Sequence, residues 1–312
     1  MQPIINSIMT NQNQVSKLDN LLSKADDYLK FEGKNKHTWC SSCGNYGIIA
    51  AIKRALALES YEPYNVMMCY DVGCNGNESD KFNANTIHGL HGRVLPLSAG
   101  CALANTHLKI IAQGGDGSTL SEGINHLVHS VRSNYPQVFI LHNNSIYGLT
   151  IGQASSTTKP GQKIAGTPGL TELSPLNVCD FVLTLDPTFV ARGFASNVDH
   201  LTDLIQQALH HDGFAFIEVL QQCPTFNKAT PQEWYWNKLI DVKSMTEYDN
   251  TDIWQARRVV QDMEEKIAVG LIYKSNRPNF LSLQSSRKGK VETLANEVKA
   301  FDISTLLQNF IV

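Results

Sequence analysis

The sequence predicts an α/β protein built on a doubly wound, mostly parallel sheet, and three observations lead to this fold class. Short apolar runs of strand length alternate along the chain with segments whose apolar residues recur at helical spacing. This alternation is typical of βαβ units, in which a helix connects two parallel strands. Polar and glycine-rich turns follow several of the runs, at the carboxyl ends of strands where such sheets bind ligands.

Length, charge and composition narrow the class of protein. The 312 residues can bury a full core, as one large domain or two small ones. A net charge of −3 gives no electrostatic case for binding nucleic acid or an anionic membrane surface. The first residues lack the basic and apolar regions of a signal peptide, and no apolar stretch approaches the roughly 20 residues of a membrane span. We therefore expect a cytoplasmic protein with no nucleic-acid or membrane partner.

The first elements follow an amino-terminal arm. Residues 1–35 are polar, with a short amphipathic helical pattern near 18–29, and predict a peripheral segment. The apolar residues of "YGIIAAIKRALALE" at 46–59 recur at helical spacing and predict a helix. The apolar run "YNVMMCYDV" at 64–72 predicts a buried strand, and the small residues of "LPLSAGCALANTHL" at 95–108 predict a tightly packed helix.

The middle of the chain continues the alternation. The apolar runs "KIIAQ" and "QVFILH" predict strands at 109–113 and 137–142. Between them, residues 121–134 place their apolar side chains on one face and predict a helix. The stretch 148–171 is rich in Gly, Ser, Thr and Pro and is too long for a simple connection, so we interpret it as a candidate functional loop.

The last third adds further strand-like runs to the pattern. Short apolar runs at 181–185 and 189–194 precede a helix predicted at 198–212, which Gly213 ends. "FAFIEVLQ" at 214–221 predicts another buried strand, and a strand-like run with a following turn spans 266–280. The predicted organisation is an arm at 1–35, a main domain at 36–245 and an extension at 246–312 that packs on that domain.

The turn Gly115-Asp116-Gly117 lies between a predicted strand and a predicted helix. Glycines let the backbone approach a ligand closely, and a helix amino terminus favours phosphate. A carboxylate there repels phosphate unless a cation such as Mg²⁺ bridges them. Asn144 ends the next strand, so its amide oxygen and the Ile146 carbonyl can complete a Mg²⁺ and diphosphate site. Alone, Gly-Asp-Gly is more often a tight turn, but the spacing and strand context favour the metal site.

Four cysteines form a second candidate site. Cys40 and Cys43 make a Cys-x-x-Cys pair, while Cys74 and Cys223 each follow a predicted strand. Four thiolates suit a [4Fe–4S] cluster, and they also suit a structural Zn²⁺. The Cys-x-x-Cys pair alone is weak evidence and fits a redox dithiol as well. The other cysteines lie in apolar or small-residue segments and are expected to be core residues: Cys69, Cys101 and Cys179.

The segment "HGLHGR" is a third candidate site, with His88, His91 and Arg93 close together among glycines. It can be a turn with solvated histidines, or its His-x-x-His can bind Zn²⁺, although no third ligand stands near. We favour an active-site loop. Its histidines can donate hydrogen bonds to a substrate carboxylate or an intermediate, and Arg93 can attract an acid.

Seven segments occur in an order that resembles one known family: "WCSSCGNYGI", "YDVGCNG", "HGLHGR", "GGDGS", "HNNSIYGLTIGQASSTT", "FVARGF" and "LQQCPTFN". Together they resemble the β subunit of 2-oxoacid:ferredoxin oxidoreductases, over roughly residues 36–285. The resemblance implies a thiamine diphosphate-binding fold that also carries Mg²⁺ and one [4Fe–4S] cluster. It implies as cluster ligands Cys40, Cys43, Cys74 and Cys223. It implies as Mg²⁺ ligands Asp116, Asn144 and the carbonyl of Ile146. The residues expected to line thiamine diphosphate are Gly73, Cys74, Asn75, Gly115, Gly117, Ser118, Gly148, Leu149 and Thr150.

The activity that the resemblance implies is CoA-dependent oxidative decarboxylation of pyruvate or 2-oxoglutarate to acyl-CoA and CO₂. Electrons pass through the cluster to ferredoxin. The carboxylate that activates the cofactor's aminopyrimidine comes in this family from an α subunit, either separate or fused to γ, so this chain alone should be inactive. Two rival hypotheses are another thiamine diphosphate enzyme, such as a non-oxidative decarboxylase or ligase, and a non-catalytic electron-transfer or zinc-stabilised subunit.

The sequence departs from the family pattern at three places. Cys-Ser-Ser-Cys replaces the usual Cys-Pro-Gly-Cys, and both thiols are kept. The family's His-Thr-x-His-Gly-Arg has lost its threonine, with Gly89 after His88. Ile151 follows "GLT", where relatives often carry Gly or Lys; a lysine there can hold a substrate carboxylate. We place no counterpart in the family for the arm at 1–35.

Overall fold

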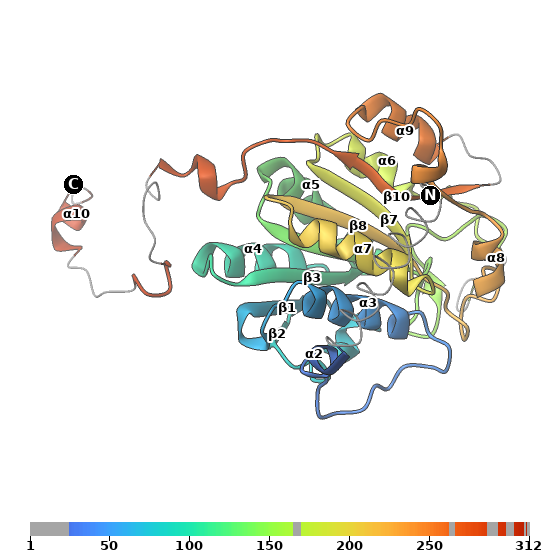
Figure 1. Cartoon of the computed structure of the whole chain (residues 1–312), viewed down its shortest axis with the longest axis horizontal. Coiled ribbons are helices and arrows are strands. Elements are labelled where there is room, and N and C mark those ends of the chain that lie inside the picture. The colour runs from blue at the N-terminus through green and yellow to red at the C-terminus, as the bar shows by residue number, and fades with distance from the viewer. Residues whose placement is uncertain are drawn as a thin grey trace, which may run out of the picture.

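A single eight-stranded sheet organises the protein, as seen in the computed structural model (Figure 1). The structure describes residues 25–164, 170–261, 266–285, 293–297, 303–308 and 310. The strand order is β2-β1-β3-β4-β8-β7-β10-β9. The strands of this sheet are β1 (Val66–Tyr70), β2 (Asn85–His88), β3 (Lys109–Gly115), β4 (Gln137–Asn143), β7 (Phe189–Phe194), β8 (Phe214–Leu220), β9 (Leu239–Asp241) and β10 (Ile267–Lys274).

Most neighbouring strands run parallel. From β2 to β7 every pair in the sheet is parallel, and β10 then pairs antiparallel to β7 and parallel to β9. A separate hairpin of β5 (Ile146–Tyr147) and β6 (Gln153–Ala154) follows β4. The parallel arrangement brings the carboxyl ends of β1, β3, β4 and β8 to one edge of the sheet, and the candidate site lies there.

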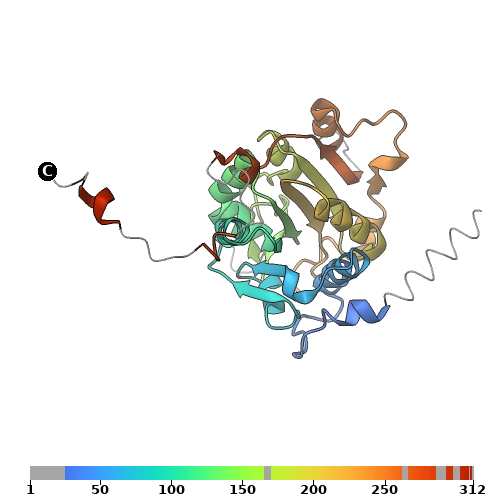
Figure 2. The same ribbon diagram turned by 60° about the vertical axis from the view of Figure 1, so that its left-hand side comes forward.

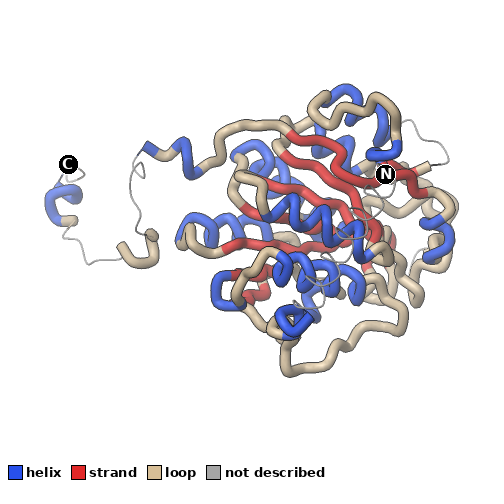
Figure 3. Tube along the Cα trace, in the orientation of Figure 1, coloured by secondary structure: helices blue, strands red, loops and turns tan. Residues whose placement is uncertain are grey.

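Helices cover both faces of the sheet (Figures 2 and 3). The helices are α2 (Ala25–Leu29), α3 (Asn45–Leu58), α4 (Val94–Ala104), α5 (Ile124–Ser133), α6 (Val178–Leu183), α7 (Val198–Leu209), α8 (Gln232–Trp236), α9 (Ile253–Gln261) and α10 (Ser304–Gln308). The short helical turns are η1 (Pro63–Asn65), η2 (Asn75–Glu78), η3 (Ser118–Glu122, a π-turn), η4 (Val242–Ser244) and η5 (Leu281–Leu283).

Two separate cores hold the layers together. Helices α3 and α7 pack with one face of the sheet, where Met68, Ile111 and Ile140 point. Helices α4, α5, α6 and α9 pack with the other face, toward which Ile110 and Phe139 point. Side chains in a strand alternate between the two faces, and here both faces are buried, so the strands read as continuous apolar runs. The predicted doubly wound α/β fold is confirmed.

The structure differs from the expected elements at the run 181–185 and in several added elements: β2, β5, β6, β9, α8 and α9. The strand β2 was not predicted, because its residues, 85–88, are exposed and it pairs only with β1 at the edge of the sheet. An exposed edge strand lacks the apolar run that marks a buried one. The apolar run at 181–185 is not a strand, and most of it belongs to helix α6.

The terminal segments are described in part. Of the predicted amphipathic pattern at 18–29, residues 25–29 form α2, and residues 1–24 lie outside the described part of the chain. Just after α2, Phe31 is fully buried in the core beside α3. Beyond residue 245, α9 and β10 both pack into the α/β body. No helix in the described part of the chain has the length and hydrophobicity needed to cross a bilayer.

Candidate active site

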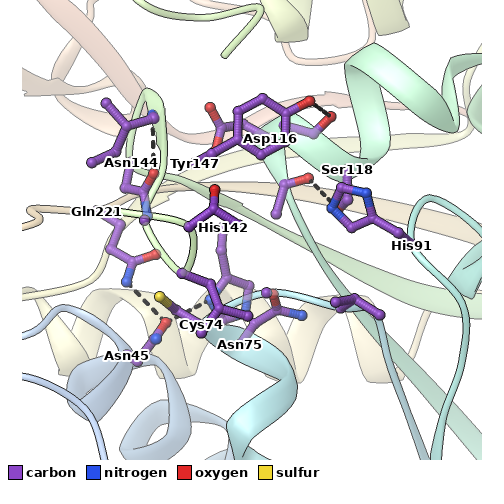
Figure 4. A pocket seen from close by; sticks show the side chains of 18 residues that line it. Asn45, Cys74, Asn75, His91, Asp116, Ser118, His142, Asn144, Tyr147 and Gln221 are labelled. Carbon is purple, nitrogen blue, oxygen red and sulfur yellow. Dashed lines mark hydrogen bonds between the residues drawn. The ribbon is translucent and has the colours of Figure 1, made fainter. Parts of the chain in front are cut away.

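Loops at the carboxyl edge of the sheet enclose one pocket (Figure 4). Its walls come from the ends of β1, β3, β4 and β8, from the first residue of α3 and from the loop after β5. The residues that line it are Asn45, Val72, Gly73, Cys74, Asn75, His91, Gly115, Asp116, Gly117, Ser118, His142, Asn144, Ile146, Tyr147, Gly148, Leu149, Thr150 and Gln221. Every residue that the sequence assigned to Mg²⁺ or to thiamine diphosphate is in this set.

Asp116 follows β3 and is the carboxylate of the pocket. Its side chain is almost fully buried, and its Oδ2 accepts hydrogen bonds from Ser155 Oγ at 2.5 Å and Thr157 Oγ1 at 2.7 Å. Burial raises the pKa of Asp116 to about 6, and the two hydroxyl donors oppose that rise. The sequence predicted a functional loop at 148–171 but not these two residues. The β5–β6 hairpin returns the chain so that both reach Asp116.

Asn144 and Ile146 occupy the end of β4 and the start of β5. Asn144 Oδ1 accepts a hydrogen bond from the backbone N of Ile146 at 3.1 Å. The backbone carbonyl of Asn144 accepts another from Asn227 Nδ2 at 2.9 Å. Between them, Ser145 has φ 60, in the left-handed region. This turn carries Asn144 and Ile146 into the same pocket as Asp116.

Close packing around Gly117 explains why that position is a glycine. A Cβ atom there would come within 2.5 Å of Tyr147 Cε1, which is too close for any side chain. Tyr147 Oη donates a hydrogen bond to the carbonyl of Gly117 at 3.1 Å, which keeps the ring against the turn. Ser118 Oγ then donates to the carbonyl of Gly115 at 3.1 Å. The Gly-Asp-Gly turn is therefore held compact, with its backbone open to the pocket.

A layer of buried amides lies beneath the pocket. His142 Nδ1 is 3.0 Å from Asn45 Oδ1, and His142 Nε2 is 2.8 Å from Gln113 Oε1. Burial lowers the pKa of His142 to about 3, so the ring is neutral and donates through only one nitrogen. Asn45 Oδ1 also accepts from Gln221, so Gln113 is the amide that turns its nitrogen toward the ring. Gln221 Nε2 donates to Asn45 Oδ1 at 2.8 Å and extends this layer.

Two polar atoms of this layer fit a polar ligand in the pocket. Asn45 Nδ2 and Gln221 Oε1 are buried, and neither has a hydrogen-bond partner in the described part of the chain. Both residues line the pocket. Unpaired buried polar atoms are costly, so they call for a partner such as a bound cofactor or water. Sequence reasoning missed Asn45, His142 and Gln221, whose only signal was polar residues beside or inside apolar segments.

The four predicted cluster cysteines line a second pocket beside the first. This pocket is formed by Thr38, Trp39, Cys40, Cys43, Cys74, Asn77, Asn144, Gly148, Leu149, Gln221, Cys223, Pro224 and Phe226. Burial raises the pKa of the Cys43 thiol to about 11 and that of the Cys74 thiol to about 12, and the neighbouring thiols add to both shifts. All seven cysteines are free. Cys69 and Cys179 are buried in the core, and Cys101 packs partly buried against it, as expected for core residues.

The donor sets of the two pockets differ in kind. Across the described residues, no group of three or more His, Cys, Asp or Glu side chains is placed to hold a metal ion. The three predicted ligands in the first pocket are the Asp116 carboxylate, the Asn144 amide oxygen and the Ile146 carbonyl, an all-oxygen set that suits Mg²⁺ bound partly by phosphate. The second offers four cysteine thiols along one cavity, a set that suits an iron–sulfur cluster or Zn²⁺. These residues fit the groups that the sequence implied.

Of the three predicted catalytic residues, only His91 reaches the pocket. Its Nδ1 is 2.7 Å from Glu122 Oε2. His88 lies exposed on the edge strand β2, with Nε2 3.1 Å from the carbonyl of Asp71. Arg93 is exposed, and its Nη1 donates to the carbonyl of Glu122 at 2.8 Å. Both residues thus contact the backbone of loops beside the pocket.

Two protein families match successive parts of the chain. Residues 69–219 match the family described as "Thiamine pyrophosphate enzyme, C-terminal TPP binding domain". Residues 223–287 match the family of the carboxyl-terminal part of the pyruvate ferredoxin oxidoreductase β subunit. The first match spans β1 to β8 and contains most of the first pocket. The second begins at Cys223 and includes β9 and β10.

Individual proteins extend the similarity to most of the chain. A 2-oxoacid:ferredoxin oxidoreductase subunit beta from a Sulfolobus species is 34% identical over 284 residues, which cover 82% of this chain and 93% of that protein. The 2-oxoglutarate oxidoreductase subunit KorB of Mycobacterium tuberculosis is 35% identical over 200 residues, 64% of this chain and 54% of that protein.

A solved structure is similar in fold over nearly the whole length. It is a 2-oxoglutarate:ferredoxin oxidoreductase from Magnetococcus marinus with 2-oxoglutarate, coenzyme A and succinyl-CoA bound. It has a TM-score of 0.83 and 28% identity, and covers 91% of this chain and 95% of that one. The shared fold, the family matches and the extent of the identity agree with the two pockets. The chain belongs to the β subunits of the 2-oxoacid:ferredoxin oxidoreductases.

Proposed function

We propose that this chain, together with an α subunit, catalyses the CoA-dependent oxidative decarboxylation of pyruvate or 2-oxoglutarate and passes the electrons to ferredoxin. One observation carries the proposal: the oxygen-lined pocket and the cysteine-lined pocket share a wall. The residues common to both are Cys74, Asn144, Gly148, Leu149 and Gln221. A shared wall suits a reaction that releases electrons in one pocket and collects them in the other.

The first pocket would hold thiamine diphosphate and Mg²⁺. Asp116, Asn144 and the carbonyl of Ile146 would hold the cation, and the backbone of Gly117 and the hydroxyl of Ser118 would face the diphosphate. Thiamine diphosphate supplies an electron sink for the carbanion left when CO₂ departs. Ser155 and Thr157 keep the Asp116 carboxylate oriented. The tight contact of Tyr147 with Gly117 keeps the turn in shape.

The second pocket would hold the [4Fe–4S] cluster on Cys40, Cys43, Cys74 and Cys223. A cluster supplies one-electron acceptance beside the two-electron chemistry of the first pocket. A structural Zn²⁺ needs four sulfurs about 2.3 Å from a single point. By ligand type the four cysteines suit either group, and the similarity to ferredoxin-linked oxidoreductases favours the cluster.

The overall reaction balances with electrons as a product. A 2-oxo acid anion and CoA thiol give acyl-CoA, CO₂, one proton and two electrons. The bond between the carboxylate and the 2-oxo carbon breaks, and a bond from that carbon to the CoA sulfur forms. Ferredoxin would accept the two electrons, one at a time, and the cysteine-lined pocket would hold the group that passes them on.

We assign to His91 the role of contacting the substrate. This residue lines the pocket, and when both ring nitrogens carry a proton, Nδ1–H donates to Glu122 and Nε2–H is left to donate to a substrate carboxylate. His88 and Arg93 act through the loop backbone, which they hold in place. The pocket is lined by no Lys or Arg among the described residues, so we assign further substrate contacts to the α subunit.

The test uses the native complex, isolated anaerobically with its α subunit. Viologen reduction is followed with pyruvate, 2-oxoglutarate and branched or aromatic 2-oxo acids, each with and without CoA. CoA-dependent reduction with one acid is expected. CO₂ release without viologen reduction would point to a non-oxidative thiamine enzyme, and bound iron without thiamine diphosphate would point to an electron-transfer subunit.

A matched pair of variants separates the two pockets. Asp116→Asn should abolish thiamine diphosphate and Mg²⁺ binding, because it removes the charge that offsets the cation, and should leave the iron content unchanged. Asp199→Asn, at an exposed aspartate on α7, serves as the control. It should keep both the binding of thiamine diphosphate with Mg²⁺ and the iron content. Full thiamine diphosphate binding in Asp116→Asn would contradict the proposed metal site.

A further inference from the structure

Gln221 stands in the wall between the two pockets and lines both of them. It follows β8 and is 1% exposed. Its Nε2 donates to Asn45 Oδ1 at 2.8 Å and lies 3.8 Å from Cys43 Sγ, within hydrogen-bonding distance for sulfur (Figure 4 shows the contact with Asn45). One amide nitrogen thus faces both the layer beneath the cofactor pocket and a cysteine of the second pocket.

The orientation of this amide is fixed by its surroundings. Asn45 Oδ1 accepts from it, and His142 anchors Asn45 from β4. If the Gln221 amide were rotated by 180°, its oxygen would face Asn45 Oδ1 and Cys43 Sγ. Both atoms are acceptors when Cys43 is a thiolate, so neither could donate a hydrogen bond to that oxygen. Gln221 Nε2, and not Oε1, therefore faces Cys43 Sγ.

The glycine after Cys43 makes this approach possible. A Cβ atom on Gly44 would lie 2.5 Å from Gln221 Cγ and would push that side chain away. The backbone of Gly44 has φ −61 and ψ −20, which any residue adopts, so the requirement for glycine comes from the space that Gln221 fills. The Cys-x-x-Cys-Gly loop is thus shaped around this side chain.

We propose that Gln221 sets the reduction potential of the cluster held by Cys43, by donating its N–H to the cysteine sulfur. The inference rests on the proposed function, because it requires the cluster. Reduction adds one negative charge, part of which resides on the cysteine sulfurs. The positive end of the N–H dipole stabilises that charge, most strongly where the site is shielded from water. Gln221 therefore makes the cluster easier to reduce.

The neighbouring residue offers a matched control. Gln222 is also buried, at 7% exposure, and carries the same amide. Its Nε2 donates to Ser196 Oγ at 2.8 Å and to the carbonyl of Ser42 at 3.4 Å, so its N–H groups are directed away from the cysteine sulfurs. A substitution at Gln222 therefore disturbs the same loop without removing the donor to Cys43.

The experiment is an anaerobic redox titration of the complex with dithionite and mediators, in which the reduced cluster is measured by electron paramagnetic resonance. Gln221→Met keeps the shape of the side chain and removes the donor. It should shift the reduction equilibrium about tenfold toward the oxidised cluster. For a one-electron couple this lowers the reduction potential by about 59 mV. Gly44→Ala should shift it in the same direction, because it displaces the amide. Gln222→Met should leave it unchanged.

The outcomes separate this inference from the function on which it rests. A wild-type complex without a cluster signal would overturn the proposed function itself. A cluster with the same potential in Gln221→Met and wild type would overturn the inference alone, as would an equal shift in Gln222→Met. If Gln221→Met loses iron, the reduction potential of the cluster in Gly44→Ala tests the inference instead. An unchanged potential in Gly44→Ala would refute the role of the amide.

Discussion

Arg192 Nε donates to Glu218 Oε2 at 2.7 Å, and the two residues stand opposite each other on β7 and β8. Both side chains are almost fully buried. Burial raises the pKa of Glu218, but the Arg192 guanidinium and further donors outweigh it and hold that pKa below its usual value. Glu218 Oε1 accepts from Asn143 Nδ2 at 2.7 Å, beside Asn144 of the site. The ion pair therefore braces the strand end that carries an expected Mg²⁺ ligand.

Removing one partner of this pair should destabilise the fold strongly. Arg192→Met leaves the buried Glu218 carboxylate without its cation, and we expect the free energy of unfolding to fall by about 3–5 kcal/mol. Arg257→Met, which breaks the more exposed pair with Asp180, should cost about 1 kcal/mol or less. Guanidinium denaturation of the purified chain measures both. Equal losses in the two variants would contradict the special role of the buried pair.

Glu78 predicts a pH dependence of stability. It is fully buried beside Tyr70 and Gln113, and burial raises its pKa to about 8 although Lys53 opposes the rise. The folded chain keeps this proton up to about pH 8, while the unfolded chain releases it near the ordinary value of 4.5. The contribution to stability is complete below that ordinary pKa and is lost as the pH rises toward 8, by about 1.4 kcal/mol per pH unit.

Glu78→Gln tests this titration, because glutamine carries no proton to lose. Its melting temperature relative to wild type should rise steadily between pH 5 and pH 8, as measured by differential scanning fluorimetry. Glu172→Gln, at an exposed position, is the matched control for the loss of a glutamate. A difference between Glu78→Gln and wild type that does not change with pH would show that Glu78 is not protonated in the folded chain.

The fold was predictable because the buried strands carry their own signal. Both faces of the central strands are covered, so β4 and β8 are apolar along most of their length. The edge strand β2 is stabilised by pairing with β1 and is otherwise exposed, so its sequence resembles that of a loop. The run at 181–185 is apolar because α6 packs against the sheet, and apolar content alone does not separate a short helix from a strand.

The site was predictable where single residue types identify the chemistry. Asp116 stands out because a carboxylate between glycines at a strand end is unusual, and the cysteines stand out because of their spacing. Ser155 and Thr157 carry no such signal, since serine and threonine are common in loops. Their role depends on the hairpin that returns them to Asp116, a contact between distant parts of the chain. His142 was predicted to lie in a strand, which it does, and its amide partners come from other elements.

Ile151 predicts a stabilising substitution. Its φ is 81, in the left-handed region, which is rare for a β-branched residue and costs about 1–3 kcal/mol. Its side chain is 66% exposed, so few contacts are lost when it is replaced. Ile151→Asn should raise the free energy of unfolding by about 1 kcal/mol, because asparagine tolerates this conformation. Leu149→Asn, two residues earlier and without a positive φ, should give no such gain in the same denaturation experiment.

Two glycine-to-alanine changes should have opposite effects. At Gly117 the new methyl group would lie 2.5 Å from the Tyr147 ring and push it out of the turn that faces the pocket. Such overpacking costs about 1–3 kcal/mol, so thiamine diphosphate should bind to the complex about tenfold more weakly, as measured by calorimetry with Mg²⁺ present. At Gly100, on an exposed face of α4, a Cβ would meet no atom within 4 Å.

Gly100→Ala should therefore stabilise the chain by about 0.5–1 kcal/mol, because alanine loses less backbone entropy in a helix. Its affinity for thiamine diphosphate should be unchanged. The pair distinguishes steric pressure on the cofactor turn from a general effect of adding methyl groups. Equal thiamine diphosphate affinity in both variants would mean that the Tyr147 ring moves freely. The close contact with Gly117 would then not be what keeps the turn open to the diphosphate.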